Sequence, residues 1–330
     1  MEPLKSTENY NPAESDAVQT LRVPGNCAGM RLDQALASLL PRYSRSRLAQ
    51  WVKAGRVTLN GERAPAKRKV REGEAIVVMP APDAETTSHR AESIPLAVVF
   101  EDEALLVVNK PAGLVVHPGS GNWQGTMLNA LLGHAPALST LPRAGIVHRL
   151  DKDTSGLLAV ARTLFSQTDL VRQLQARTVK REYLAVVHGR VARNGRIEAP
   201  IGRHPVKRTR MAVTARGRQA VTHYEVLERY AAATLLRCRL ETGRTHQIRV
   251  HLSALGHPLV GDPAYGRRAS PIDFPRQALH AERLGLLHPV TRRPMEWQAE
   301  IPADMQTLIA TLRAEGHPKP ESRAARPRAR

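Results

Sequence analysis

The chain contains little cysteine, few aromatic residues and no long apolar run. Its two cysteines, Cys27 and Cys238, lie far apart and outside any CxxC pair, which argues against a disulfide framework and structural zinc and favours a reducing, cytoplasmic setting. Because no run of about 18 apolar residues occurs, we expect no membrane span. The polar first residues also lack the apolar segment of a secretory signal. Aromatic residues make up 4% of the chain, too few for broad stacking platforms on single-stranded nucleic acid.

Positive charge is what the chain has in excess. It carries 49 Lys and Arg residues against 30 Asp and Glu, a formal net charge of +19. Such an excess favours a polyanionic partner, because basic side chains that neutralise phosphates release condensed counterions. A host whose proteins are generally basic is the alternative explanation. With 330 residues, 42% of them hydrophobic, the chain is long enough for one large domain and a small one.

The segment 21–80, after a leader at 1–20 that we expect to be disordered, has the pattern of a small basic domain. Apolar residues recur at helical spacing from Met30 to Leu40, and Ser44 is placed to cap a second helix. An Asn-Gly turn after the strand-like run Arg56 to Leu59 predicts a hairpin. Basic residues around the second helix predict contacts with RNA phosphates, with a solvated helix face as the alternative; the candidates are Arg31, Arg45, Arg47, Lys53 and Arg56.

The rest of the chain is expected to form a larger domain at 94–312, with a polar linker at 81–93 before it and a basic disordered tail at 313–330 after it. Within this domain, short strand-like runs alternate with turns and a few helical segments. A helix is expected at 166–176, and strands are expected at 180–187 and 232–240.

The stretch GIVHRLDKDTSGLLAV, residues 145–160, places two carboxylates between apolar runs at 145–147 and 157–160 that we expect to be buried strands. From Asp151 onward it begins like a calcium loop, but the twelfth position holds Arg162 instead of a bidentate Glu, which excludes calcium. An aspartic-protease dyad needs a second such loop, and the sequence has none. The histidines are scattered, several of them close to arginines that repel cations, so we expect no metal site.

A carboxylate among cations is the chemical feature that this loop retains. Asp151 lies between Arg149 and Lys152, and nearby positive charge favours the ionised form of a carboxylate. An ionised Asp can act as nucleophile or base on a sugar ring. The alternative is that Asp151 or Asp153 only stabilises the turn, and Asp153, followed by two hydroxyl residues, is better suited to that task.

Two further segments carry candidates for the same site. In LETGRTHQIRVHL, Thr245 is placed to cap a helix, and Arg249 projects from its first turns, either to pair with a carboxylate of another loop or as a surface Arg. Tyr183 lies on a predicted strand, where it is either a core residue or a stacking surface for a base. The rigid turn at 109–113 follows a buried strand and is suited to shaping a cleft.

In their order along the chain, these segments resemble the RluA-type family of RNA pseudouridine synthases, and the segment before Ala81 resembles the S4 RNA-binding domain. The S4 resemblance rests on RLDQAL, SRSRLAQWVKAGRVTLNG and VREGEAIVV. The synthase resemblance spans nearly all of Leu96 to Pro302 and rests on VVNKPAGLVVHPG, GIVHRLDKDTSGLLAVAR, KREYLAVVHG, LETGRTHQIRVHL, GHPLVGDPAYG and RQALHAERLGLLHP. It implies an α+β fold in which the small S4-like domain precedes a catalytic domain with a mixed, mainly antiparallel sheet flanked by helices and loops.

The resemblance also implies roles for individual residues. Asp151 matches the catalytic Asp, Arg149 a residue that contacts RNA around the flipped nucleotide, and Tyr183 the residue that stacks on the target uracil. Arg249 matches the basic partner of the catalytic carboxylate, and Leu279 an apolar residue of the pocket. The implied reaction cleaves the N1–C1′ bond of a uridine and rejoins the uracil through C5, without cofactor or metal. Whether Asp151 attacks the sugar or removes its C2′ proton stays open.

The implied partner is 23S ribosomal RNA or a precursor of the large ribosomal subunit, with the helix-69 stem-loop as the target, and we expect a monomer. One alternative is a related synthase acting on other rRNA or tRNA uridines. Another is a non-catalytic RNA-binding factor for ribosome assembly, against which the joint presence of the catalytic Asp, Tyr and Arg argues. The loop 266–276 is shorter than the resemblance predicts, which bears on contacts with RNA and not on the chemistry.

Overall fold

The structure is a computed structural model that describes residues 18–41, 43, 45–80, 90–118, 124–207, 209–267 and 270–316. Ser44, most of the predicted linker (81–89) and the predicted tail from residue 317 onward lie outside these residues. Strand β1 begins at Gln19, inside the segment expected to be a disordered leader, because residues 19–22 pair with β4. Helix α6 ends at Ala314, two residues inside the expected tail.

The elements near the start of the chain form a small α+β unit. Its elements are β1 (Gln19–Arg22), α1 (Leu32–Leu39), α2 (Arg45–Lys53), β2 (Val57–Leu59), β3 (Glu62–Arg63) and β4 (Ala75–Val78). The strands form a sheet in the order β1-β4-β2-β3, and both helices contribute to a core with Leu36, Leu48 and Ile76. The predicted hairpin is confirmed: β2 and β3 meet at Asn60 and Gly61, whose φ angles of 53° and 86° suit the tight turn.

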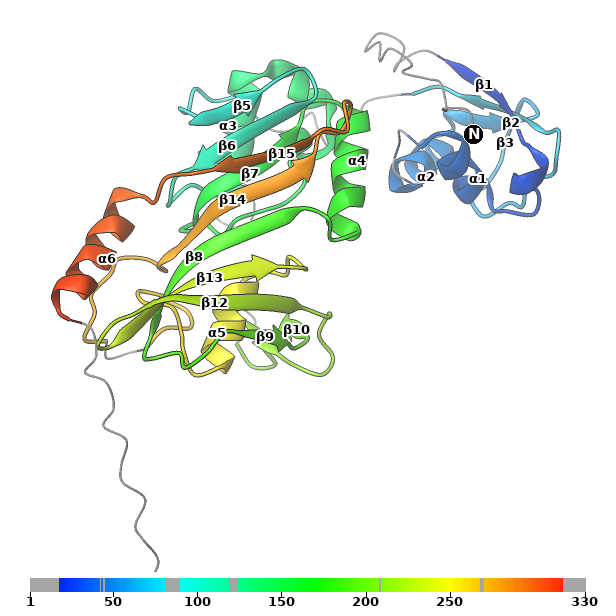
Figure 1. The fold of residues 1–330 in the computed structure, drawn as a ribbon. Coiled ribbons are helices and arrows are strands. Elements are labelled where there is room, and N and C mark those ends of the chain that lie inside the picture. Colours follow the sequence, from blue (N-terminus) through cyan, green and yellow to red (C-terminus); the bar gives the residue numbers. More distant parts are fainter. Residues whose placement is uncertain are drawn as a thin grey trace, which may run out of the picture.

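A nine-stranded sheet dominates the rest of the described chain (Figure 1). Its order is β5-β6-β7-β14-β8-β13-β12-β9, and β15 pairs with β14 off this path. All pairings are antiparallel except that of β7 with β14, where Ser155 lies opposite His280 and Gly156 opposite Ala281. The sheet is therefore mixed and mainly antiparallel, as predicted.

The strands of this sheet are β5 (Val98–Glu101), β6 (Leu105–Lys110), β7 (Ser155–Ala161), β8 (Lys180–His188), β9 (Gly195–Glu198), β12 (Val221–Arg229), β13 (Ala233–Leu240), β14 (Leu279–Leu287) and β15 (Pro294–Gln298). A separate hairpin consists of β10 (Ile201–Arg203) and β11 (Met211–Val213). The strands expected at 180–187 and 232–240 are thus confirmed as β8 and β13.

Helices pack on both faces of the sheet, and the alternation of side chains along the strands decides which core each residue joins. From β8, Tyr183, Ala185 and Val187 join the core that holds α3 (Met127–His134) and α5 (Gln247–Ala254). The intervening Leu184 and Val186 face the opposite side and pack with α6 (Ala303–Ala314). On that second side, α4 (Leu164–Gln175) covers β6 and β7, and its start is capped by Thr163, whose Oγ1 accepts from the amide of Ser166 at 3.1 Å.

The apolar run at 145–147 does not form the predicted strand. Residues Pro142–Gly145 form a 3₁₀ turn in which Arg143 and Ala144 adopt left-handed φ angles, and Ile146 makes a single bridge to Val160. Gly145, with φ 77°, lies so close to β7 that a Cβ atom there would be 1.9 Å from the carbonyl oxygen of Ala161. β14 pairs with β7 only at Ser155 and Gly156, so this edge of β7 stays open beyond them. The left-handed φ angles of the turn up to Gly145 keep the chain from running extended beside it, and only Ile146 makes a bridge.

Candidate active site

Asp151 lies in a tight turn that enters β7. The amide of Thr154 donates to the carbonyl of Asp151 at 3.1 Å, and the Ser155 hydroxyl lies 2.9 Å from Nδ1 of His280 on β14. Asp153, expected to stabilise the turn, contributes its main-chain carbonyl, which accepts from Arg276 at 3.1 Å. The turn is therefore tied to the sheet on both sides of Asp151, and this leaves its carboxylate at the surface of a cleft.

A buried lysine, Lys110, also holds this turn. Nζ of Lys110 donates to the carbonyls of Pro111, Leu114 and Lys152 at 2.8 to 2.9 Å, and the amide of Gly113 also reaches the Lys152 carbonyl. Burial lowers the pKa of Lys110 to about 7, against the opposing effect of the nearby carboxylates. The turn at 109–113 thus supports the Asp151 loop, which gives the predicted cleft-shaping segment a specific contact.

Arg249 joins Asp151 to a second carboxylate. One terminal nitrogen of its guanidinium donates to Oδ2 of Asp151 at 3.0 Å, and its other edge makes a two-bond pair with Asp262 at 2.8 and 2.9 Å. The Arg249 side chain is 6% exposed and that of Asp262 is fully buried. Burial pulls the pKa of Arg249 down, but its bonds and charge contacts with both carboxylates outweigh this and raise it. The predicted meeting of Arg249 with a carboxylate of another loop is present.

Asp262 is a residue of this site that was not predicted from the sequence. Asp262 also accepts from the amides of Ala264 and Tyr265 at 2.8 and 3.0 Å, so it closes its own turn while it holds Arg249. Burial raises the pKa of Asp262. The hydrogen bonds and the charge of Arg249 lower it, together with the two amide bonds, and they outweigh burial, so the pKa lies below its ordinary value. It lies in the quoted GHPLVGDPAYG motif, yet a lone Asp next to a glycine reads as an ordinary turn residue.

Helix α5 begins at Gln247, and Thr245 is not its cap, contrary to prediction. His246 occupies the N-cap position in a left-handed conformation, φ 55° and ψ 25°, without a side-chain cap bond. The start is instead stabilised by Gln247, whose Oε1 accepts from the Thr242 hydroxyl at 2.8 Å and from the Arg244 amide at 3.0 Å. This arrangement turns His246 toward Asp151. At the other end of the helix, Gly256 follows with φ 88°, a conformation that favours glycine.

Tyr183 and Leu279 lie side by side on the cleft face of the sheet. Tyr183 on β8 is paired with Ala281 on β14, and Leu279 is two residues earlier on β14, so both side chains point to the same face. Both are buried at the edge of the main core, and both line the cleft. Burial raises the pKa of Tyr183, so its hydroxyl keeps its proton. The two readings of Tyr183, as a core residue and as a surface for a base, are thus compatible.

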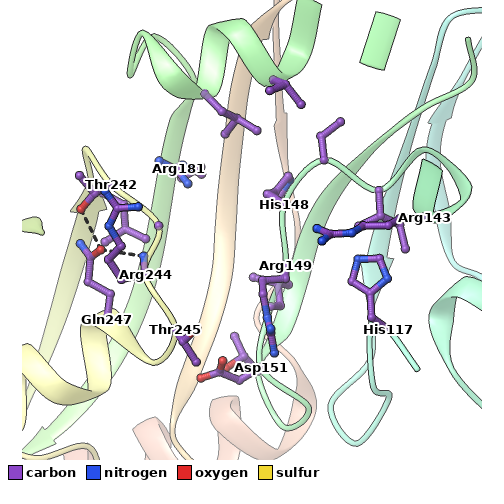
Figure 2. A pocket seen from close by; sticks show the side chains of 18 of the residues that line it. His117, Arg143, His148, Arg149, Asp151, Arg181, Thr242, Arg244, Thr245 and Gln247 are labelled. Atoms are coloured by element: carbon purple, nitrogen blue, oxygen red, sulfur yellow. Dashed lines mark hydrogen bonds between the residues drawn. The ribbon is translucent and has the colours of Figure 1, made fainter. Parts of the chain in front are cut away.

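The cleft has a volume of about 920 Å³ and is lined by all five residues predicted for the catalytic domain: Arg149, Asp151, Tyr183, Arg249 and Leu279. Figure 2 shows Arg244 and Gln247 on one wall and Arg143 and His117 on the other, with Asp151 between them at the lower end. Arg149 is exposed on the loop next to Asp151. Arginines outnumber carboxylates in the lining, so the cleft suits an anionic ligand.

Arg181 and His148 also line the cleft, and Figure 2 shows both at the end away from Asp151. Arg181 is buried, burial lowers its pKa, and its Nε has no hydrogen-bond partner within the described part of the chain. Nε2 of His148 accepts from the amide of Ala159 at 3.0 Å, and burial, with the charge of Arg181, lowers the pKa of His148 to about 3. His148 is therefore neutral, and of these two residues Arg181 carries the positive charge.

The basic residues predicted for the small domain differ in their surroundings. Arg31 and Arg45 both bind the carboxylate of Asp33, at 3.0 and 2.8 Å. Arg47 is 4% exposed, and its guanidinium lies 5.3 Å from the centre of the Trp51 ring. The sequence predicted an exposed charge at this position, but the side chain is buried. Lys53 and Arg56 are exposed at the end of α2 and the start of β2.

Two properties of the described residues bear on membrane insertion and metal binding. None of their helices is both long and apolar enough to cross a bilayer. Within the same residues, His, Cys, Asp and Glu side chains form no group of three or more that could hold a metal ion. Both cysteines are buried and free.

Comparison with known proteins finds matches to both parts of the chain. The S4 domain profile matches residues 30–76, and the profile described as RNA pseudouridylate synthase matches residues 104–254. The "Ribosomal large subunit pseudouridine synthase D" of Nitrosomonas europaea is 56% identical over 315 residues, which cover 93% of this chain and 90% of that protein. The protein of the same name from Xanthomonas campestris is 51% identical, over 93% of this chain and 96% of that protein.

A solved structure, the human RNA pseudouridylate synthase domain containing 1, aligns with a TM-score of 0.52 at 28% identity and covers 70% of this chain and all of that one. The fold, the family profiles and full-length relatives at more than half identity agree with one another. The chain belongs to the RNA pseudouridine synthase family and is an isomerase with an N-terminal S4 RNA-binding domain.

Proposed function

We propose that this enzyme converts uridines of 23S ribosomal RNA to pseudouridine in the helix-69 stem-loop, with Asp151 as the catalytic residue and without a cofactor. The observation that carries the proposal is the ion pair between Asp151 and Arg249, 3.0 Å apart across 98 positions of sequence, beside Tyr183 in a basic cleft. The names of the bacterial relatives support a large-subunit substrate, and the S4 domain supports RNA binding. A ribosomal substrate places the reaction in the cytoplasm.

The proposed chemistry needs one carboxylate at the sugar and a site that retains the base. The N1–C1′ bond of the uridine breaks, and Asp151 either bonds to C1′ or removes the C2′ proton. The uracil turns, and C5 bonds to C1′. C5 then loses its proton, and N1 gains one, so reactant and product have the same composition. A cleft of about 920 Å³ has room for a nucleoside whose base turns without leaving.

Substrate binding is assigned to the arginines and to the Tyr183–Leu279 surface. A base inside an RNA stem-loop must leave its stack, which costs a few kcal/mol. Arg149 is exposed beside Asp151, where it contacts the RNA around the extruded nucleotide, and Tyr183 with Leu279 packs against the uracil. In the small domain, which we assign to residues 21–80, exposed basic residues such as Lys53 and Arg56 bind phosphates outside the cleft.

The test is the pair of variants Asp151→Asn and Asp153→Asn on a helix-69 stem-loop transcript. Asp151→Asn keeps the shape of the side chain but removes the nucleophile or base, so we expect the rate to fall by at least about 10³-fold while RNA binding is retained. Asp153→Asn removes the neighbouring charge and is expected to keep most of the activity. Normal pseudouridine formation by Asp151→Asn would reject the assignment.

The target is tested separately in cells. Chemical mapping of pseudouridine in total RNA, with and without the gene for this protein, is expected to show sites lost from helix 69 of 23S RNA. Loss of sites only in other rRNA or in tRNA would replace the target and leave the chemistry standing. An unchanged map, together with an inactive purified enzyme, would favour an RNA-binding assembly factor.

A further inference from the structure

The two oxygens of the Asp151 carboxylate have different surroundings. Oδ2 accepts from Arg249 at 3.0 Å, whereas Oδ1 faces Nε2 of His246 at 3.9 Å, too far for a hydrogen bond. The Asp151 side chain is 14% exposed and lies in the cleft wall, as does His246. Oδ1 is therefore the oxygen left for a substrate, and an imidazole nitrogen lies on the other side of a gap that one small group can fill.

The hydrogen bonds of Tyr265 assign the tautomer of His246. The Tyr265 hydroxyl oxygen accepts from the amide of Met211 at 2.8 Å, and it lies 2.8 Å from Nδ1 of His246. Among the described residues, Nδ1 is the acceptor that the phenolic proton reaches. Nδ1 then carries no proton of its own, and a neutral imidazole must carry its proton on Nε2, the nitrogen that faces Asp151.

The backbone keeps this ring in place. His246 adopts φ 55° and ψ 25°, a left-handed conformation that a non-glycine residue holds at a cost, and one that is common at functional sites. Its ring contacts that of Tyr265 edge to face, with centroids 5.6 Å apart. The Arg249 guanidinium lies over the Tyr265 ring, 5.2 Å from its centre, so the same tyrosine contacts both neighbours of Asp151.

The charged groups around His246 favour its neutral form. Burial lowers the pKa of His246, and Arg249 and Arg149 act in the same direction, while Asp151 and Asp262 oppose them; the net shift is downward. A neutral Nε2–H next to a carboxylate oxygen is a donor beside an acceptor. That combination matches a hydroxyl group, which accepts one hydrogen bond and donates another.

We propose that His246 is a specificity-determining residue that, together with Oδ1 of Asp151, binds the 2′-hydroxyl of the target ribose. In this arrangement Nε2–H of His246 donates to O2′, and the O2′ proton is donated to Oδ1. With hydrogen bonds of about 2.8 Å on both sides, the 3.9 Å gap accommodates one oxygen atom. The pair distinguishes RNA from DNA at the target nucleotide, because the 2′-hydroxyl is the group that DNA lacks. The inference rests on the proposed function, since it requires a uridine ribose at Asp151.

The first experiment compares two stem-loops that differ in one atom. Helix-69 RNA with pseudouridine or with 2′-deoxypseudouridine at the modified position is bound to the protein, and affinity is measured by fluorescence anisotropy. Both forms already carry the product base, so the enzyme changes neither of them during the measurement. We expect the wild-type protein to bind the ribose form about tenfold more tightly. In His246→Met, which keeps the bulk but removes the donor, the ratio is expected to fall close to one.

The matched control is His246→Gln, whose side-chain amide reaches a position similar to Nε2 and donates. This variant is expected to regain most of the ribose preference, which a purely structural role of the imidazole does not explain. If His246→Met loses activity but keeps the wild-type ratio of affinities, the inference is wrong.

The second experiment reads the tautomer on the protein alone. Nitrogen-15 NMR of labelled histidine is expected to show His246 protonated at Nε2, and Tyr265→Phe is expected to reduce the population of that form. An Nδ1–H form in the wild type overturns the inference without reference to any RNA. If the wild-type protein makes no pseudouridine in the stem-loop, the proposed target is wrong, and the NMR result alone decides the state of His246.

Discussion

The small domain and the catalytic domain each contain a cluster of three charged groups in which two groups of one sign flank one of the other sign, and the two clusters have opposite signs and different exposure. In the small domain, Arg31 and Arg45 flank the carboxylate of Asp33, and the two arginine side chains are 39% and 49% exposed. In the catalytic domain, Asp151 and Asp262 flank Arg249, which is 6% exposed. Water screens the first arrangement, whereas the second must be balanced by the protein itself.

The difference teaches where a change of charge is tolerated. An exposed arginine that loses its partner is solvated by water and keeps the freedom to bind a phosphate. A buried arginine that is removed leaves Asp262 without a counter-charge in a site that water does not reach. We therefore expect large effects on folding and chemistry in the catalytic domain, and effects on RNA affinity in the small one.

The largest effect is expected for Arg249→Met. It leaves Asp262 buried and unpaired, and it frees Oδ2 of Asp151, so we predict a loss of about 3–5 kcal/mol in the free energy of unfolding and of at least about 10³-fold in rate. Denaturant titration and single-turnover assays measure the two losses. Arg249→Lys keeps the charge but not the two-sided fork, so it is expected to fall between wild type and Met. Equal stability of wild type and Arg249→Met would mean that burial does not distinguish the two arrangements.

A smaller effect is expected from His148, the neutral base beside Arg181. Its pKa is about 3 in the folded protein against an ordinary value of 6.5, so between these values the unfolded chain binds more protons and stability falls as the pH falls. From pH 7 to pH 5 this loss amounts to about 2 kcal/mol. His148→Gln has no such proton to bind, so its unfolding free energy should fall by about that much less over the same range. Parallel pH profiles for the two proteins would contradict the burial of a neutral imidazole.

The smallest effect is expected for the double variant Lys53→Gln/Arg56→Gln. Both side chains are exposed, so stability should change by less than about 1 kcal/mol, while affinity for the stem-loop at low salt falls roughly tenfold. The slope of log affinity against log salt should decrease by about 2, one for each phosphate contact. Lys180→Gln/Arg292→Gln removes the same charge from the catalytic domain and serves as the control. Identical salt slopes for both double variants would remove the proposed role of the small domain.

Local signals were sufficient for much of the fold. The Asn60–Gly61 turn and the strand around Tyr183 depend on neighbours in sequence, and both were predicted correctly. The run at 145–147 has the composition of a strand, but whether it pairs depends on the turn before it and on the close contact of Gly145 with Ala161 of β7, which its own pattern does not show. Thr245 has the chemistry of a cap, yet Gln247 stabilises the helix start from inside through Thr242 and Arg244.

The site was predictable only in part for the same reason. Resemblance to a family predicted five residues of one site, and the structure places all of them around one cleft: Arg149, Asp151, Tyr183, Arg249 and Leu279. Asp262, which holds Arg249 in place, had no signal because its partner is in a different turn of the chain. Arg47 looked like a surface charge, but its burial depends on packing against Trp51 in the folded domain.

The parallel contact between β7 and β14 affects when the active site can form during synthesis of the chain. Gly156 there is so close to β14 that a Cβ atom would lie 2.2 Å from the carbonyl oxygen of Ala281. Asp151 is synthesised before its partners in the site. Arg249, Asp262 and β14 follow about a hundred residues later in the chain. Because the cleft requires both stretches, a growing chain has no assembled site until its last strands are docked. An enzyme made on ribosomes thus completes its own active site only near the end of its translation.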